Sequence, residues 1–112
     1  FNDIIGVTVL DKSPVYKIIF WVSDSSKDYV MTKPLHDSQR VLSMDETHIL
    51  QNKFPFLKDG VFFRMDCKRN YELIRELTSF SENLLVIEPK DIQNEIYEKI
   101  SLLNNNYNKL RT

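Results

Sequence analysis

Residues Val15–Val22 read VYKIIFWV, a run of eight residues dominated by β-branched and aromatic side chains. This composition is typical of a β-strand. Because successive side chains of a strand point to opposite faces, the run has two distinct sides. One side carries Tyr16, Ile18, Phe20 and Val22, and the other carries Val15, Lys17, Ile19 and Trp21. The second side, which includes a lysine, is predicted to lie on the outer face of a sheet.

Three further strands are predicted downstream. Val61–Lys68 reads VFFRMDCK and alternates in the same way. Its inner side holds Val61, Phe63, Met65 and Cys67, and its outer side holds Phe62, Arg64, Asp66 and Lys68. Ser38–Met44 is predicted as another strand. Leu84–Ile87 reads LLVI and is predicted as a short strand that is buried, because it is fully apolar.

A short helix and a long loop are predicted on either side of the second strand. Ser23 or Asp24 is expected to cap a helix over Lys27–Met31, which ends on the approach to Pro34. The segment Asp45–Gly60 is predicted to be a long polar hairpin tip that closes with an Asp-Gly turn pair.

Two longer helices follow the third strand. Asn70 is expected to cap a helix that runs through Phe80, and Pro89 suits the first position of a last helix. That last helix carries an apolar stripe formed by Ile92, Ile96, Ile100, Leu103, Tyr107 and Leu110. We expect the stripe to belong first to the core and second to a dimer seam. The asparagines at positions 104–106 are expected to let the helix end fray.

The order of these elements predicts the fold class. It is β-α-β-β-α-β with an added C-terminal helix, the α+β arrangement of the ferredoxin-like split βαβ fold. In that fold the first and third strands are neighbours at the centre of the sheet. Residues 1–14 are predicted to be an entry segment and residues 15–112 a single domain. Because the chain opens on Phe rather than Met, we expect a piece of a longer protein.

The composition excludes several classes of protein. The 112 residues carry 15 basic and 16 acidic side chains, which is unlike a free-standing duplex-DNA binder. A single cysteine excludes an internal disulfide, and only two glycines leave no phosphate-cradling loop. The sequence shows neither an apolar run of transmembrane length nor a secretory signal. We therefore expect a cytoplasmic protein without membrane contact.

No constellation of side chains predicts an enzyme, a cofactor or a metal site. His36–Ser38 contains the residue types of a catalytic triad, but adjacent residues do not generally converge as base, orienting group and nucleophile. The acidic and histidine side chains at positions 45, 46 and 48 have metal-binding chemistry, yet a solvated loop is the favoured interpretation. Cys67 is predicted to be a buried, inert thiol.

The outer face of the predicted sheet is the best candidate for a binding surface. Its two central strands would place Lys17, Ile19 and Trp21 beside Phe62, Arg64 and Lys68. Aromatic rings interleaved with cations can stack bases and contact phosphates, as a platform for single-stranded nucleic acid does. The sequence lacks the glycine-containing aromatic signature of RNA-recognition modules. We favour a face covered by the C-terminal helix or a partner subunit, because an exposed apolar cluster rarely stays bare.

Short motifs spread over nearly the whole chain resemble one known family. Pro34–Gln39 reads PLHDSQ and matches the pattern P-x-H-x-S-Q. Asn70–Leu73, Leu77–Phe80 and Val86–Pro89 follow in the order and spacing of n-x-E-L, l-x-S-F-G and V-x-x-P. The opening segment Phe1–Val7 is also similar. In combination they resemble the C-terminal extension of WYL-domain bacterial transcriptional regulators.

The resemblance implies a function. Regulators of this family have an N-terminal winged helix-turn-helix, a middle Sm-like WYL β-domain and this extension, which is described as ferredoxin-like. It implies a non-catalytic regulatory domain that senses an effector, a nucleic acid in some members, and that mediates homodimerisation. A nucleic-acid or nucleotide effector is therefore expected. Promoter DNA would be read only by the N-terminal domain, which lies outside this chain.

Seven residues are the candidates for effector or partner contact under this interpretation. They are Lys17, Trp21, His36, Gln39, Arg40, Phe62 and Arg64. The alternative function is a single-stranded nucleic-acid platform on the same open face. The sequence departs from the family pattern at two places. Ser81 stands where the family usually has glycine, so we expect a different backbone geometry at that helix end. The segment between Met44 and Gly60 is longer than usual, and its role is not predicted.

Overall fold

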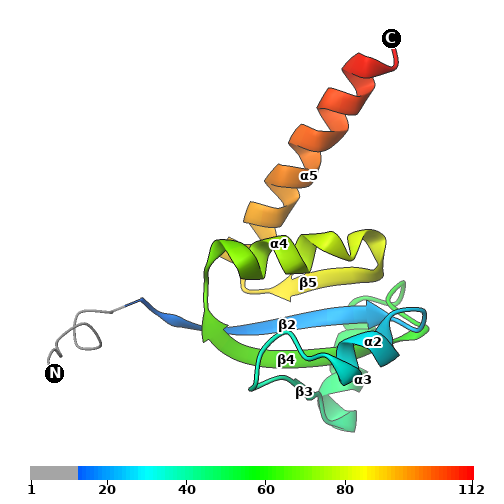
Figure 1. Ribbon diagram of the computed structural model, residues 1–112. Helices are drawn as coiled ribbons and strands as arrows, with labels where there is room; N and C mark the ends of the chain where they lie inside the picture. The colour runs from blue at the N-terminus through cyan, green and yellow to red at the C-terminus, as the bar shows by residue number, and fades with distance from the viewer. Residues whose placement is uncertain (1–12) are drawn as a thin grey trace, which may run out of the picture.

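The computed structural model describes residues 13–112, so all but the last two residues of the predicted entry segment lie outside it. The described residues form four β-strands, four α-helices and one 3-10 turn (Figure 1). In chain order these are β2 (Val15–Ser23), α2 (Lys27–Thr32), β3 (Arg40–Val41), α3 (Met44–Lys53), β4 (Gly60–Lys68), α4 (Tyr71–Ser79), η1 (Ser81–Asn83), β5 (Leu84–Glu88) and α5 (Lys90–Leu110).

The strands form one antiparallel sheet in the order β3-β4-β2-β5. Strands β2 and β4 are its central pair, and they stay in register over nine residues, from Val15 opposite Lys68 to Ser23 opposite Gly60. The prediction that these two strands are central neighbours is therefore confirmed. The fold class is α+β, with helices on both faces of the sheet.

The inner face of the sheet carries the main core, as the alternation of β2 and β4 predicts. Helices α2 and α4 and the first turn of α5 pack there. The rings of Phe20 and Phe63 stack with centroids 5.5 Å apart. The buried residues of this core are Ile18, Phe20, Val22, Val30, Phe63, Met65, Cys67, Leu73, Ile74, Leu77, Leu84 and Ile92.

The outer face is covered by the segment that follows β3. A second cluster joins Ile19, Trp21 and Phe62 of the sheet to Leu42 and Leu57, with Leu50, Phe54 and Ile87 packed against it. Coverage of the apolar cluster on this face is confirmed, but the C-terminal helix is not the cover. The cover comes from residues 42–57, which include the segment without a predicted role.

The predicted polar hairpin tip contains helix α3. Ser43 is its N-cap and forms a capping box with Glu46, whose carboxylate accepts the backbone N–H of Ser43. These hydrogen bonds lower the pKa of Glu46. None of its residues is fully buried, and its sequence lacks the apolar periodicity that normally predicts a helix. Because Ser43 begins α3, the strand predicted over Ser38–Met44 shortens to Arg40–Val41.

Two smaller predictions about caps and burial need correction. Helix α2 begins after Ser26, rather than Ser23 or Asp24. Strand β5 is an edge strand in which only Leu84 is buried, because residues 13–112 supply a pairing partner on one side alone. Asn70 caps α4 as predicted, by accepting the N–H of Leu73 at 2.8 Å.

The end of α4 keeps the backbone geometry that a glycine would adopt. Ser81 has φ 56°, in the left-handed region that favours glycine. The different geometry expected from its side chain is therefore not found.

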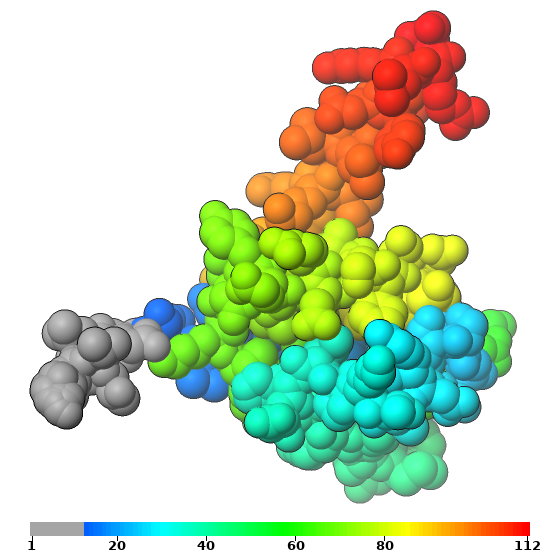
Figure 2. Space-filling view, viewed as in Figure 1, coloured from blue at the N-terminus to red at the C-terminus, as the bar shows by residue number. Residues whose placement is uncertain are grey.

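Helix α5 extends beyond the body of the domain. Pro89 is its N-cap rather than its first residue, and the helix continues through the asparagines at 104–106 to Leu110. Of its apolar stripe only Ile92 is buried, and Ile96 is partly buried. Figures 1 and 2 show the rest of the helix standing clear of the sheet and the other helices. The prediction that the stripe belongs to the core holds for its first turns alone.

Candidate functional site

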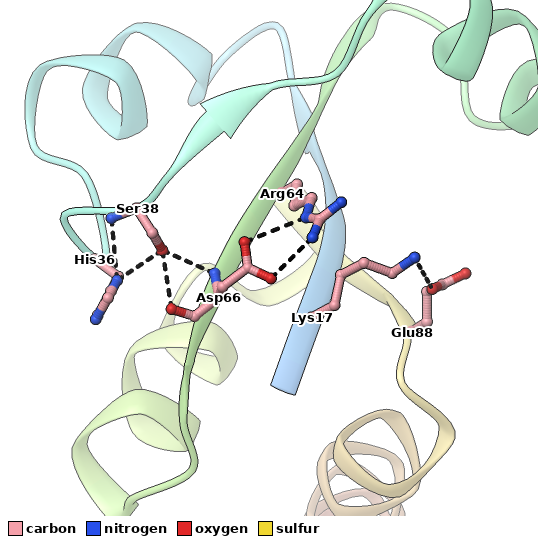
Figure 3. A network of polar contacts seen from close by, with 6 residues as sticks. All are labelled: Lys17, His36, Ser38, Arg64, Asp66 and Glu88. Carbon is pink, nitrogen blue, oxygen red and sulfur yellow. Dashed lines mark hydrogen bonds and ion pairs between the residues drawn. The ribbon is translucent and has the colours of Figure 1, made fainter. Parts of the chain in front are cut away.

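Strands β2, β4 and β3 place three of the predicted site residues, Lys17, Arg64 and Arg40, in a charged patch on the outer face. Arg64 donates two hydrogen bonds to the Asp66 carboxylate, one from Nε at 3.3 Å and one from Nη2 at 3.1 Å (Figure 3). This pairing holds the pKa of Asp66 below its ordinary value. Lys17 Nζ lies 3.8 Å from Glu88 Oε1. Arg40 of β3 lies opposite Arg64 in the sheet register.

The patch is electrically balanced. Its cations Lys17, Arg40 and Arg64 are matched by Glu46, Asp66 and Glu88, which lie near them. A site for phosphate or another polyanion needs an excess of positive charge that its own carboxylates do not cancel. The patch is therefore better suited to holding the strands together than to capturing an anion.

Trp21 and Phe62 are on the same face but beneath its cover. Their side chains are 9% and 1% exposed. Neither ring can stack on a base while α3 and the following loop stay in place. The Trp21 indole Nε1 is also buried, without a hydrogen-bond acceptor among the described residues. The open face on which the nucleic-acid platform depends is not found.

His36 and Gln39 build a corner between α2 and β3 instead of joining the charged patch. Gln39 Oε1 accepts the N–H of Leu35 at 2.9 Å, and its Nε2 donates to the Val30 carbonyl at 3.1 Å. Ser38 Oγ exchanges hydrogen bonds with the backbone of Asp66, at 2.8 and 3.1 Å, and lies 2.8 Å from His36 Nδ1 (Figure 3). The hydroxyl is thus occupied in fixing the chain to β4.

The other candidate chemistries also find structural explanations. Cys67 is buried in the inner core, and burial raises the pKa of its thiol, so the reactive thiolate is disfavoured. Within residues 13–112, no group of three or more His, Cys, Asp or Glu side chains is arranged to hold a metal ion. Asp45 and Glu46 lie in the first turn of α3, where acidic side chains complement the helix dipole.

An apolar groove that the sequence did not reveal lies beside the edge of β5 that pairs with no other strand of residues 13–112. We call it the edge groove. It encloses about 270 Å³ between the 54–57 segment, strand β5 and helices α4 and α5. Its walls include Phe56, Leu57, Leu85, Ile96, Tyr97 and Ile100. Phe56 and Tyr97 are 70% and 69% exposed, so the groove is open to an outside partner.

The stripe of α5 continues the apolar surface of the groove. From Ile96 onward its steps are 4, 3, 4 and 3 residues, the spacing of a coiled-coil seam. The side chains beyond Ile96 are about half exposed or more: Ile100 at 49%, Leu103 at 54%, Tyr107 at 57% and Leu110 at 78%. Groove and stripe together form one continuous apolar surface.

The first turns of α5 are fixed to the body. Arg69 binds the Glu95 carboxylate with both Nε, at 2.8 Å, and Nη2, which lowers the pKa of Glu95. Gln93 Nε2 donates to the carbonyls of Val86 and Ile87 at 3.1 and 3.2 Å, and so covers part of the β5 edge. Because its base is held on both sides, the exposed part of α5 has a defined direction.

Sequence reasoning predicted the stripe but missed the groove. The only local signal was the apolar run Phe54–Leu57 inside an otherwise polar segment. Whether those side chains line a groove depends on contacts with β5 and α5, which are distant in sequence.

None of the helices in residues 13–112 is long and apolar enough to cross a membrane. No family model matches the sequence, and no curated protein matches it significantly.

Proposed function

We propose that this chain is the C-terminal regulatory domain of a WYL-family transcriptional regulator and that it joins two copies of the regulator. Two features support the family assignment. The motifs described above follow one another in the family's order and spacing. The strand order β5-β2-β4-β3 is also the order of a ferredoxin-like split βαβ fold, with α3 inserted between its second and third strands.

The residues that carry the resemblance have roles in folding. Ser38 and Gln39 tie the corner before β3, Asn70 caps α4, and Leu73 and Leu77 are buried in the core. A shared motif of this kind supports a shared architecture. The function must rest on the surfaces that the architecture leaves exposed.

The exposed apolar surface of α5 is the observation that carries the proposal. Soluble proteins seldom leave a continuous apolar patch bare unless a partner covers it. A helix with coiled-coil spacing is suited to a second copy of itself. The effector-sensing part of the role rests on the resemblance, with exposed Lys17, His36 and Arg40 as its remaining surface candidates.

Two neighbouring leucines allow a matched test. Leu103 lies on the stripe and is 54% exposed, whereas Leu102 is 62% exposed but lies off the stripe. In sedimentation equilibrium we expect the wild-type chain and Leu102→Asp to be dimers, and Leu103→Asp to be a monomer. A monomeric wild type, or equal effects of the two substitutions, would contradict the proposal.

The nucleic-acid alternative is tested separately by fluorescence anisotropy with labelled single strands at low and moderate salt. Because Trp21 and Phe62 are buried, we expect no binding that weakens with salt. Salt-sensitive binding that Lys17→Ala abolishes would instead favour the charged patch as a nucleic-acid site.

A further inference from the structure

We infer that the second copy docks its α5 antiparallel to the first, so that the C-terminal half of each α5 fills the edge groove of the other copy. The inference rests on the proposed dimer and specifies its geometry. It commits the groove to one occupant, a second copy of this chain. Shape, charge and buried area each favour this arrangement.

Shape is the first argument. Ile96 and Ile100 belong both to the stripe and to the wall of the groove, so whatever lies along the stripe also meets the groove. A parallel partner would present its own groove at that level, and two hollows facing one another leave a void. An antiparallel partner presents the convex far half of α5, with the large side chains of Tyr107 and Leu110.

Charge is the second argument. Beyond Lys99 the helix and its cap carry two cations, Lys109 and Arg111, and no carboxylate side chain. Parallel packing would bring these cations of both copies together at one end. Antiparallel packing moves them apart. Each pair then faces a half of α5 in which Asp91 and Glu98 are offset by Lys90 and Lys99, and in which Glu95 is paired with Arg69, so the gain is the removal of the repulsion between cations. It also places the two helix dipoles in opposite directions, which is favourable.

The heptad spacing fixes a register. Packing Ile100 against Leu103 of the partner subunit also brings Ile96 level with Tyr107 of the partner subunit. The groove and the stripe expose six large side chains, each about half exposed or more: Phe56, Tyr97, Ile100, Leu103, Tyr107 and Leu110. Full burial of an aromatic side chain removes about 150–250 Å² from water and that of an aliphatic one somewhat less, so covering all six would bury roughly 600 Å² per copy. The total of about 1,200 Å² reaches the lower bound of stable specific interfaces.

Spin labels one heptad apart test the direction of packing. Asn105 lies on α5 opposite the stripe. Thr112, one heptad further on, follows the C-cap Arg111, whose backbone angles are helical, so labels at the two positions extend about equally far from the seam. With a rise of 1.5 Å per residue, the antiparallel register offsets the two copies along the axis by about 10 Å at position 105 and about 30 Å at position 112. A parallel register gives no axial offset at either position.

The experiment uses Asn105→Cys and Thr112→Cys in the full 112-residue chain, each in a Cys67→Ala background. Pulsed electron spin resonance should give a clearly longer distance between labels at 112 than between labels at 105. Equal distances would overturn the antiparallel arrangement but leave the dimer standing. Absence of any dimer would overturn the proposed function itself.

A groove variant tests the occupant. Phe56→Asp alters an exposed side chain of the groove wall, and Met44→Asp is its control on α3, at 73% exposure. We expect Phe56→Asp to raise the dimer dissociation constant at least about tenfold, since an apolar contact is replaced by a charge, and Met44→Asp to leave it unchanged. An unchanged constant for Phe56→Asp would show that the groove is empty in the dimer.

Discussion

Replacing Ser81 by glycine should stabilise this domain. Ser81 has φ 56° at the end of α4, and a residue with a Cβ in the left-handed region costs about 1–2 kcal/mol. Glycine removes that cost but makes the unfolded chain more flexible, which costs about 0.5–1 kcal/mol. The difference is a net gain of about 0.5–1 kcal/mol. For a domain of this size it raises Tm by about 2–6 °C.

Thermal unfolding followed by circular dichroism measures this gain, and two variants serve as controls. Ser79→Gly, two residues upstream in the last turn of α4, should lower Tm because glycine weakens a helix and the Ser79 hydroxyl loses its bond to the Glu76 carbonyl. Ser81→Val should also lower it, since a β-branched side chain tolerates positive φ poorly. Equal Tm values for Ser81→Gly and Ser81→Val would refute the reasoning.

Three further predictions address packing, the corner before β3 and acid stability. A Cβ on Gly60 would clash with Trp21 Nε1 and with the backbone oxygen of Val22, so Gly60→Ala should cost about 1–3 kcal/mol and shift the emission of Trp21, the only tryptophan of the sequence. An unchanged emission spectrum and stability would contradict the contact. Gln39→Ala should cost about 1–2 kcal/mol in urea unfolding, because it removes the partners of two backbone groups, the Leu35 N–H and the Val30 carbonyl. Asp37→Ala, at an exposed position of the same corner, should cost little. Arg69 lowers the pKa of Glu95, so this carboxylate stabilises the fold fully above its unfolded pKa of about 4.5 and loses that effect as the pH falls through the lower pKa of the folded state. The difference in unfolding free energy between wild type and Glu95→Gln should therefore shrink on acidification. A difference that stays constant with pH would exclude this linkage.

The local sequence pattern was sufficient to predict the strands and helices that bury one face. The alternation of β2 and β4 predicted which residues face the inner core, and Asn70 marked the start of α4 correctly. These elements obey simple periods because water is excluded from one face only. Helix α3 was missed although Ser43 and Glu46 supply a capping box, since its weak apolar periodicity left the segment looking like a polar loop.

The candidate site shows where local pattern stops being informative. The sequence placed Lys17, Trp21, Phe62 and Arg64 on one face, and the structure agrees with that placement. It did not reveal that the two rings are covered by residues 42–57, because the cover is formed by contacts between segments distant in the chain. Removal of those rings from solvent leaves the edge groove and α5 as the surface open to a partner.

The sequence by itself determined the order of the strands and of helices α2, α4 and α5, the inner core and the apolar stripe of α5, because each follows from the spacing of residues along a single element. Only the tertiary structure decided which apolar side chains remain in contact with water. The stripe keeps steps of three or four residues along its whole length, yet Ile92 is buried and Leu110 is 78% exposed. The difference arises because α5 is longer than the body against which it packs, and a side chain is buried only where another part of the chain reaches it.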